Sequence, residues 1–156
     1  MSTPVVDAPV PAFSLPSTAG TDFHLADARG KALVLYFYPK DATPGCTTES
    51  EAFRDLHAQF RRAGAEVLGI SRDSLASHEK FRTRLELPFH LLSDAEEKAC
   101  HLFEVIREKN LYGKKVMGIE RSTFLIDAQG VLRREWRKVK VAGHAEEVLE
   151  AARSLG

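Results

Sequence analysis

The sequence predicts an α/β fold built on a mixed β-sheet, and three patterns predict it. Early in the chain, short apolar segments typical of strands alternate with segments whose apolar residues recur at helical spacing. Late in the chain, two apolar segments flank a turn that contains Gly130, as in an antiparallel hairpin. The 156 residues correspond to about one domain. Because no linker or repeat divides them, we expect a single domain over residues 1–156.

The first predicted elements are a hairpin, a central strand and a long helix. Two short apolar patches on either side of Ser17–Gly20 predict an N-terminal β-hairpin. The continuous apolar run Ala32–Tyr38 ends at Pro39, as expected of a central strand that is covered on both faces. Apolar residues recur at helical spacing over Thr47–Ala63 and predict a helix, and Glu66–Ser71 predicts a second strand.

The remaining elements are shorter. A helix capped by Asp94 should extend through Cys100 to Ile106, with its apolar residues on one side. Arg107–Arg121 contains glycine and asparagine breaks and five basic residues, so we expect an irregular segment there. The other expected elements are, in order, a helix that is capped by Asp73 or Ser74 and carries Leu85, a strand over His90–Ser93, two strands over Thr123–Ile126 and Val131–Trp136 around the turn Asp127–Gly130, and a helix over Ala145–Leu155.

Composition excludes several classes of protein. Lys and Arg number 22, as do Asp and Glu, so the net charge is zero and no global field favours nucleic acid or an anionic membrane. The two cysteines show neither Cys-x-x-Cys nor zinc-site spacing, so we expect a reducing compartment. Met1–Pro11 lacks the features of a signal peptide, and no apolar run approaches about 18 residues. We therefore expect a cytoplasmic protein without a membrane span.

Cys46 has the most distinctive chemical setting in the chain. It follows the loop after the central strand and falls in the first turn of the next helix. Unpaired N–H groups and the positive end of the helix dipole favour an anion there, so we expect the thiol to ionise readily and to act as a nucleophile. The alternative is that Cys46 is a small buried apolar residue, which is common for a free cysteine.

Two segments carry a family resemblance. The pattern P-x-x-x-T-x-x-C from Pro39 to Cys46 resembles the peroxidatic-cysteine motif of peroxiredoxins, and Tyr112–Asp127 resembles their second signature. The sequences of Asp41–Thr47 and Trp136–His144 are similar to those of the bacterioferritin-comigratory, or Q-type, subfamily of peroxiredoxins. The resemblance spans nearly the whole chain. It implies a thioredoxin-like fold and a thiol-dependent peroxidase that reduces hydrogen peroxide and organic hydroperoxides.

The resemblance also implies catalytic roles for four residues. Cys46 is the implied nucleophile, which attacks the peroxide and becomes a sulfenic acid. Thr43 would form a hydrogen bond with the peroxide, and Arg121 would pair with the thiolate and with the departing oxygen. Pro39 would shape the pocket and shield the sulfur from water. Without the resemblance, Thr43 is a helix N-cap, Pro39 ends a strand and Arg121 is a solvated surface charge.

Two further residues are candidates for substrate binding. Glu49, one helical turn after the cysteine, could hold the guanidinium of Arg121 in place. The backbone N–H groups of Gly45 and Cys46 are further candidate donors to the peroxide.

The way in which the sulfenic acid is reduced depends on a second cysteine. The resemblance places a resolving cysteine either at position 51, which is Glu51 here, or around Phe81–Leu85, where the chain has none. Cys100 is the other thiol, and it is expected in the core, with resolution of the sulfenic acid by Cys100 as the alternative. We therefore expect a one-cysteine cycle in which thioredoxin, glutaredoxin, glutathione or another thiol supplies the reductant.

Interpretations from other classes stay open. A cysteine hydrolase would pair Cys46 with a histidine, of which His57 is the closest in sequence. A non-enzymatic nucleic-acid-binding module would use the basic residues around Trp136, which otherwise belong to a solvated edge strand. The histidines show no metal-ligand spacing and no Gly-rich nucleotide loop is present, so we expect neither metal nor cofactor. We expect no nucleic-acid partner, and the resemblance implies a monomer, with a dimer as the alternative.

Overall fold

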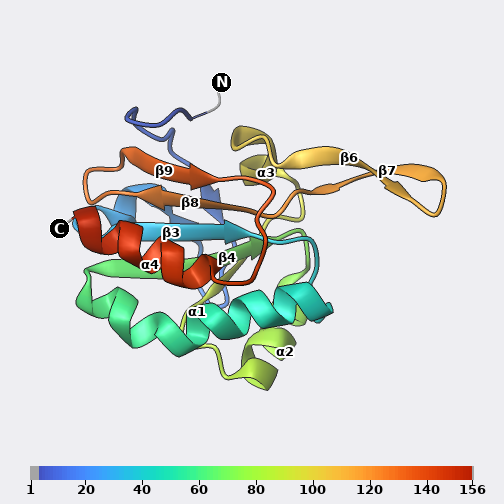
Figure 1. The fold of residues 1–156 in the computed structure, drawn as a ribbon, viewed down its shortest axis with the longest axis horizontal. Helices are drawn as coiled ribbons and strands as arrows, with labels where there is room; N and C mark the ends of the chain where they lie inside the picture. Colours follow the sequence, from blue (N-terminus) through green and yellow to red (C-terminus); the bar gives the residue numbers. More distant parts are fainter. Residues whose placement is uncertain (1–3, 156) are drawn as a thin grey trace.

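A five-stranded sheet organises residues 4–155, the part of the chain that the computed structural model describes (Figure 1). Its strands lie in the order β5-β4-β3-β8-β9, and two smaller sheets pair β1 with β2 and β6 with β7. The elements are, in chain order, β1 (Ser14–Leu15), β2 (Phe23–His24), a 3-10 helix (Leu25–Ala28), β3 (Ala32–Phe37), α1 (Pro44–Arg62), β4 (Ala65–Ser71), α2 (Leu75–Leu85), β5 (Leu91–Ser93), α3 (Lys98–Leu102), β6 (Ile106–Leu111), β7 (Lys114–Ile119), β8 (Ser122–Ile126), β9 (Leu132–Trp136) and α4 (His144–Leu155).

The strand β3 lies at the centre of the sheet, and all its residues are buried. It pairs in parallel with β4 and antiparallel with β8. A parallel pair needs a crossover connection, which α1 supplies, whereas β8 and β9 form the hairpin predicted around Asp127–Gly130. The predicted fold class, a mixed sheet with flanking helices and an N-terminal hairpin, is therefore confirmed.

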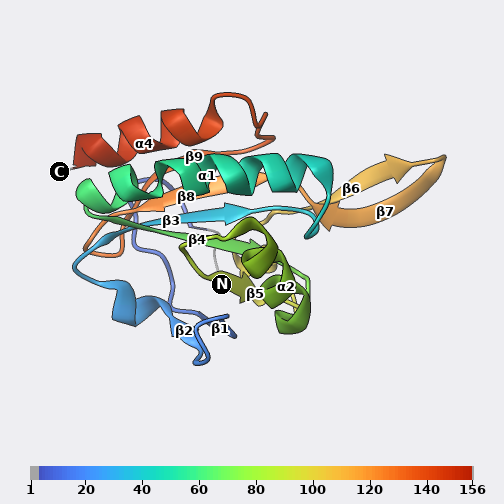
Figure 2. The same cartoon turned by 90° about the horizontal axis from the view of Figure 1, so that it is seen from below.

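The central sheet divides the core into two layers, one on each of its faces. Figure 2 shows α1 and α4 side by side on one face, with the β1–β2 hairpin on the other. One buried cluster joins Phe53 of α1 to Val148 of α4, and the second joins Leu15 of β1 to Cys100 of α3. No helix over residues 4–155 combines the length and the apolarity that crossing a bilayer needs.

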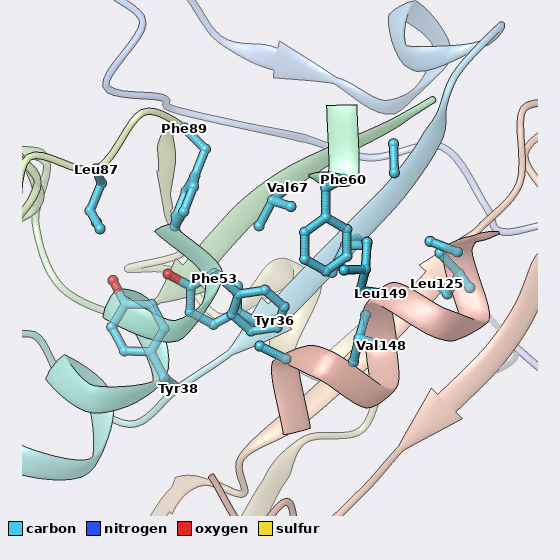
Figure 3. Close-up of a cluster of buried hydrophobic side chains, with 14 of the residues drawn as sticks. Tyr36, Tyr38, Phe53, Phe60, Val67, Leu87, Phe89, Leu125, Val148 and Leu149 are labelled. Atoms are coloured by element: carbon cyan, nitrogen blue, oxygen red, sulfur yellow. The ribbon is translucent and has the colours of Figure 1, made fainter. Parts of the chain in front are cut away.

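Aromatic rings attach α1 to the end of β3 (Figure 3). Tyr36 of β3 stacks on Phe53 with ring centroids 4.7 Å apart, and on Tyr38 at 5.5 Å. The hydroxyl of Tyr36 lies 2.9 Å from Oγ of Ser50, which satisfies a polar group that would be costly to bury alone. This packing fixes α1 against the strand end from which the loop to Cys46 departs.

The predicted helix from Asp94 to Ile106 is shorter in the structure than expected. Only Lys98–Leu102 is helical, and Asp94 is not its N-cap. Glu97, which precedes the helix, has a left-handed backbone with φ 60°, so the helical turn starts later than the sequence pattern indicated. The carboxylate of Asp94 accepts a hydrogen bond from the amide of Cys100 instead, at 2.7 Å.

The prediction of an irregular segment over Arg107–Arg121 is also wrong, because most of this segment forms the hairpin β6–β7. Its strands pair antiparallel from Ile106↔Ile119 to Leu111↔Lys114, and the turn contains Tyr112 and Gly113 with positive φ values of 53° and 80°. The hairpin projects from the body of the molecule (Figure 2). Most of β7 is exposed, so the strands lack the apolar alternation by which a half-buried strand is recognised.

Candidate active site

The register of the central sheet brings two distant segments together. Ser122, the first residue of β8, pairs with Phe37, the last residue of β3. Arg121 precedes Ser122 and therefore lies beside the loop that leaves β3 and leads into α1. Cys46 follows this loop. The antiparallel pairing of β3 with β8 thus assembles a site from residues 75 positions apart.

The start of α1 directs backbone N–H groups toward the site. Thr43 is the N-cap, Pro44 is the first helical residue, and the first intrahelical hydrogen bond is donated by the amide of Thr47 to the carbonyl of Thr43. The amides of Gly45 and Cys46 precede that bond, at the positive end of the helix dipole. This placement of Cys46 in the first turn confirms the expected strand-to-helix junction.

Thr43 caps the helix by position but not with its side chain. Its hydroxyl donates to the carbonyl of Lys40 at 2.8 Å and makes no side-chain capping bond within the described chain. Since the hydroxyl proton is committed to Lys40, the oxygen is left to accept hydrogen bonds.

One guanidinium contacts both acidic groups of the site. Nη2 of Arg121 lies 3.5 Å from Sγ of Cys46, and Nη1 lies 2.5 Å from Oε1 of Glu49. Gly45 leaves room for this approach, because a Cβ atom at that position would lie 3.0 Å from Nη2 and the guanidinium would have to shift. Cys46 and Glu49 are each 1% exposed. The structure therefore brings Arg121 into contact with both Cys46 and Glu49.

Burial governs the protonation of Glu49 despite the neighbouring cation. Burial raises the pKa of Glu49 to about 7, although the charge and the hydrogen bond of Arg121 lower it. Oε2 of Glu49 is buried and has no hydrogen-bond partner within residues 4–155. Burial lowers the pKa of Arg121, but Glu49 and Cys46 outweigh it, so the net shift is upward and the guanidinium stays charged.

Two other residues, Pro39 and Lys109, lie near the site. Pro39 is half-buried just after β3, at the expected end of the strand. Lys109 of β6 was not expected from the sequence, and its Nζ donates to the carbonyl of Ile119 at 2.6 Å. Burial, followed by the charge of Arg121, lowers the pKa of Lys109 while Cys46 raises it, which places this cation within electrostatic reach of the sulfur.

A second group of polar side chains lies behind the loop, and sequence reasoning missed it. Asp41 accepts hydrogen bonds from the hydroxyl of Tyr38 at 2.6 Å, from Ser77 at 2.8 Å and from Nδ1 of His78 at 2.7 Å. His78 lies on the buried, otherwise apolar face of the helix α2, with Phe81 and Leu85. A histidine on such a face needs a polar partner, and Asp41 is that partner.

Asp41 and His78 of this group form, together with Asp73, the one candidate metal cluster within residues 4–155. Ligand atoms of Asp41, Asp73 and His78 lie within 4.8 Å of one another. Both ring nitrogens of His78 already face hydrogen-bond acceptors, and Oδ2 of Asp73 accepts from Ser71 and from the amide of Asp41. These bonds use the atoms that a metal ion would need, so the set does not fit a metal.

Cys100 lies in the other layer of the core from Cys46. The two cysteines belong to the buried clusters on opposite faces of the sheet, and neither forms a disulfide. Burial, and then the charge of Asp94, raise the pKa of Cys100. Its expected position in the core is confirmed.

Comparison with known proteins identifies the family. The family model described as "AhpC/TSA family" matches residues 6–135. Peroxiredoxin Bcp of Xanthomonas campestris is 50% identical over 156 residues, covering 99% of this chain and 98% of the relative. Peroxiredoxin Bcp of Bacillus subtilis is 49% identical over 145 residues, covering 93% and 92% of the two chains.

Solved structures agree with the sequence relatives. A Xylella fastidiosa PrxQ mutant has a TM-score of 0.92 at 42% identity and covers 99% of both chains. The bacterioferritin comigratory protein of Xanthomonas campestris, described for its alkyl peroxide reduction activity, has a TM-score of 0.87 at 50% identity and covers 92% of this chain and 91% of its own. The thioredoxin-like fold implied by the motifs is therefore confirmed. The chain belongs to the AhpC/TSA family, among its Bcp or Q-type peroxiredoxins, and is a thiol-dependent peroxidase that uses a peroxide and a thiol reductant.

Proposed function

We propose that Cys46 is the nucleophile of a one-cysteine peroxidase cycle that reduces hydrogen peroxide and organic hydroperoxides. The observation that carries the proposal is the 3.5 Å contact between Arg121 and the Cys46 sulfur at the start of α1. A cation and two free amides around a buried sulfur favour its anionic form, which is the nucleophilic form of cysteine.

The proposed reaction has two halves. In the first, the thiolate attacks the terminal peroxide oxygen, the O–O bond breaks, and the leaving oxygen takes a proton to become water or an alcohol, while Cys46 becomes a sulfenic acid. In the second, an external thiol forms a mixed disulfide with Cys46 and releases water. A second thiol then releases the Cys46 thiolate and leaves the reductant oxidised. The reductant is thioredoxin or another cellular thiol.

The surrounding residues act on the breaking O–O bond. The oxygen of Thr43 accepts a hydrogen bond from the peroxide, because its own proton is held by the carbonyl of Lys40. Arg121 and the amides of Gly45 and Cys46 donate to the oxygen on which negative charge develops. Pro39 shapes the pocket and limits the access of water to the sulfur.

The environment of Cys100 supports reduction by an external thiol. A disulfide needs the two Cα atoms within about 7 Å, and the two cysteines lie in core layers on opposite faces of the central sheet. Cys100 is fully buried, and its pKa is raised by burial and by Asp94, so it is a weak nucleophile. We therefore favour the one-cysteine cycle over resolution by Cys100.

The same proposal includes a cytoplasmic monomer of one domain that acts without nucleic acid. Three of the basic residues near Trp136 are engaged within the protein, which disfavours a nucleic-acid-binding function. Arg133 pairs with Asp7 and Asp127, Arg137 pairs with Glu135, and the guanidinium of Arg134 lies 4.7 Å from the centre of the Trp136 ring.

Intact mass spectrometry tests the cycle. After one equivalent of peroxide under anaerobic conditions, the wild-type chain should gain the mass of one oxygen, and a Cys100→Ser variant should do the same. Cys46→Ser should neither gain oxygen nor turn over peroxide. An intramolecular Cys46–Cys100 disulfide in the wild type would rule out the one-cysteine cycle, and peroxidase activity in Cys46→Ser would rule out the nucleophile.

Arg121→Met should lower the second-order rate constant for the reaction of the protein with peroxide by about 10²–10³-fold, the usual cost of removing one donor to a developing oxyanion. Stopped-flow kinetics with hydrogen peroxide measures this constant. Arg107→Met is the matched control, because Arg107 is an exposed arginine of the adjacent hairpin. Equal rate constants for Arg121→Met and the wild type would contradict the role of Arg121.

Glu49→Gln should change how stability depends on pH. The pKa of Glu49 is raised to about 7 in the folded protein, so the folded chain binds more protons than the unfolded chain between the ordinary value of 4.5 and about 7. Stability must therefore fall as pH rises through this window. Relative to Glu49→Gln, the wild type should lose about 2–3 kcal/mol of unfolding free energy between about pH 5 and pH 8.

Urea unfolding at several pH values measures this difference. Glu51→Gln on the same helix is the control for the loss of one carboxylate, since that side chain is 41% exposed. A constant difference between the wild type and Glu49→Gln across the range would show that Glu49 does not carry the proton.

A further inference from the structure

His78 occupies an unusual position behind the loop that leads to Cys46. The side chain is fully buried. Its Nδ1 lies 2.7 Å from Oδ2 of Asp41, and its Nε2 lies 2.9 Å from the carbonyl oxygen of Leu92 in β5. A backbone carbonyl can only accept, so Nε2 carries a proton.

Asp41 is the partner of the other ring nitrogen. Its two carboxylate oxygens already accept from the hydroxyls of Tyr38 and Ser77. Burial raises the pKa of Asp41, but hydrogen bonding and the charge of His78, followed by the two hydroxyls, outweigh it, so the pKa is lowered and Asp41 is a carboxylate. Nδ1 of His78 and Oδ2 of Asp41 share one hydrogen across 2.7 Å, so both ring nitrogens of His78 are engaged in hydrogen bonds.

The pair anchors a loop whose backbone is strained. The amide of Asp41 donates to Oδ2 of Asp73 at 2.9 Å, so both the backbone and the side chain of Asp41 are held. The next residue, Ala42, has φ 65°, a left-handed conformation that costs a non-glycine residue about 1–2 kcal/mol. Such a conformation persists only where surrounding contacts impose it. Thr43 and the first turn of α1 follow directly.

We propose that His78 is a positioning residue for peroxide reduction, acting through Asp41 and the left-handed Ala42 to fix the place of Thr43. The inference rests on the proposed role of Thr43, and it extends the site to the helix α2. The other titratable groups that face the pair are Tyr38, which directly follows β3, and Asp73 from the segment before α2. A misplacement of about 1 Å at a reacting group costs on the order of 10²-fold in rate.

A double-mutant cycle tests the proposal. His78→Gln removes the imidazole ring and at least one of its two hydrogen bonds, and should lower the rate constant for peroxide by about 10–100-fold. Thr43→Val should lower the same constant in the wild-type background. In the His78→Gln background, Thr43→Val should cost about two-fold or less, because Thr43 is already displaced. A purely structural role for His78 would leave the two effects multiplicative.

The control is His101→Gln. His101 also pairs with a carboxylate, that of Glu97, but on the surface of α3, so its replacement should leave the rate constant unchanged. Near-ultraviolet circular dichroism checks the packing of each variant. If His78→Gln does not fold, Tyr38→Phe removes a single hydroxyl from Asp41 and takes its place in the cycle, with an expected loss of about 3–10-fold.

Two outcomes would overturn the inference. One is a folded His78→Gln protein whose rate constant lies within about two-fold of the wild type, and the other is a Thr43→Val effect of equal size in both backgrounds. Either result together with an inactive Cys46→Ser variant would remove only the role of His78. Peroxidase activity in Cys46→Ser would instead remove the proposed function on which this inference rests.

Discussion

The candidate site is arranged around one guanidinium that contacts two buried side chains, a thiol and a carboxyl group. Arg121 reaches the sulfur of Cys46 with one nitrogen and the carboxylate of Glu49 with another. Buried charges are tolerated only when they are paired, and here one cation serves two candidate anions. Burial raises the pKa of Glu49 to about 7, and the charge and the hydrogen bond of Arg121 offset this rise only in part.

Two pairs of side chains, Asp41 with His78 and Glu49 with Arg121, flank the loop and the helix start that carry Cys46. The carboxyl groups of Asp41 and Glu49 come from the continuous segment that contains Cys46, whereas their partners His78 and Arg121 follow later in the chain. The local segment places the thiol at a helix start, but distant residues supply the partners of its carboxyl groups. The parallel pairing of β3 with β4 and the antiparallel pairing of β3 with β8 bring those neighbours to the same strand end.

Sequence reasoning succeeded where the signal was local or was carried by a motif. The buried run of β3 and the helix that follows it placed Cys46 correctly, and the motif that contains Arg121 led to a residue whose contact with sulfur no periodicity could have predicted. It failed for β6–β7, because a hairpin that projects from the core has few buried residues and so lacks the alternation of apolar and polar residues that marks a strand. It also missed the Asp41–His78 pair, since a contact 37 residues apart depends on how α2 packs against the loop.

The contrast between the two cysteines shows that burial alone does not decide the reactivity of a thiol. Both are almost fully buried. Cys46 faces a cation and the positive end of a long helix, whereas Cys100 faces the carboxylate of Asp94, which adds to the effect of burial and raises the pKa of Cys100. The sign of the neighbouring charge therefore separates the two. The two cysteines thus lie on opposite faces of one sheet and next to groups of opposite charge.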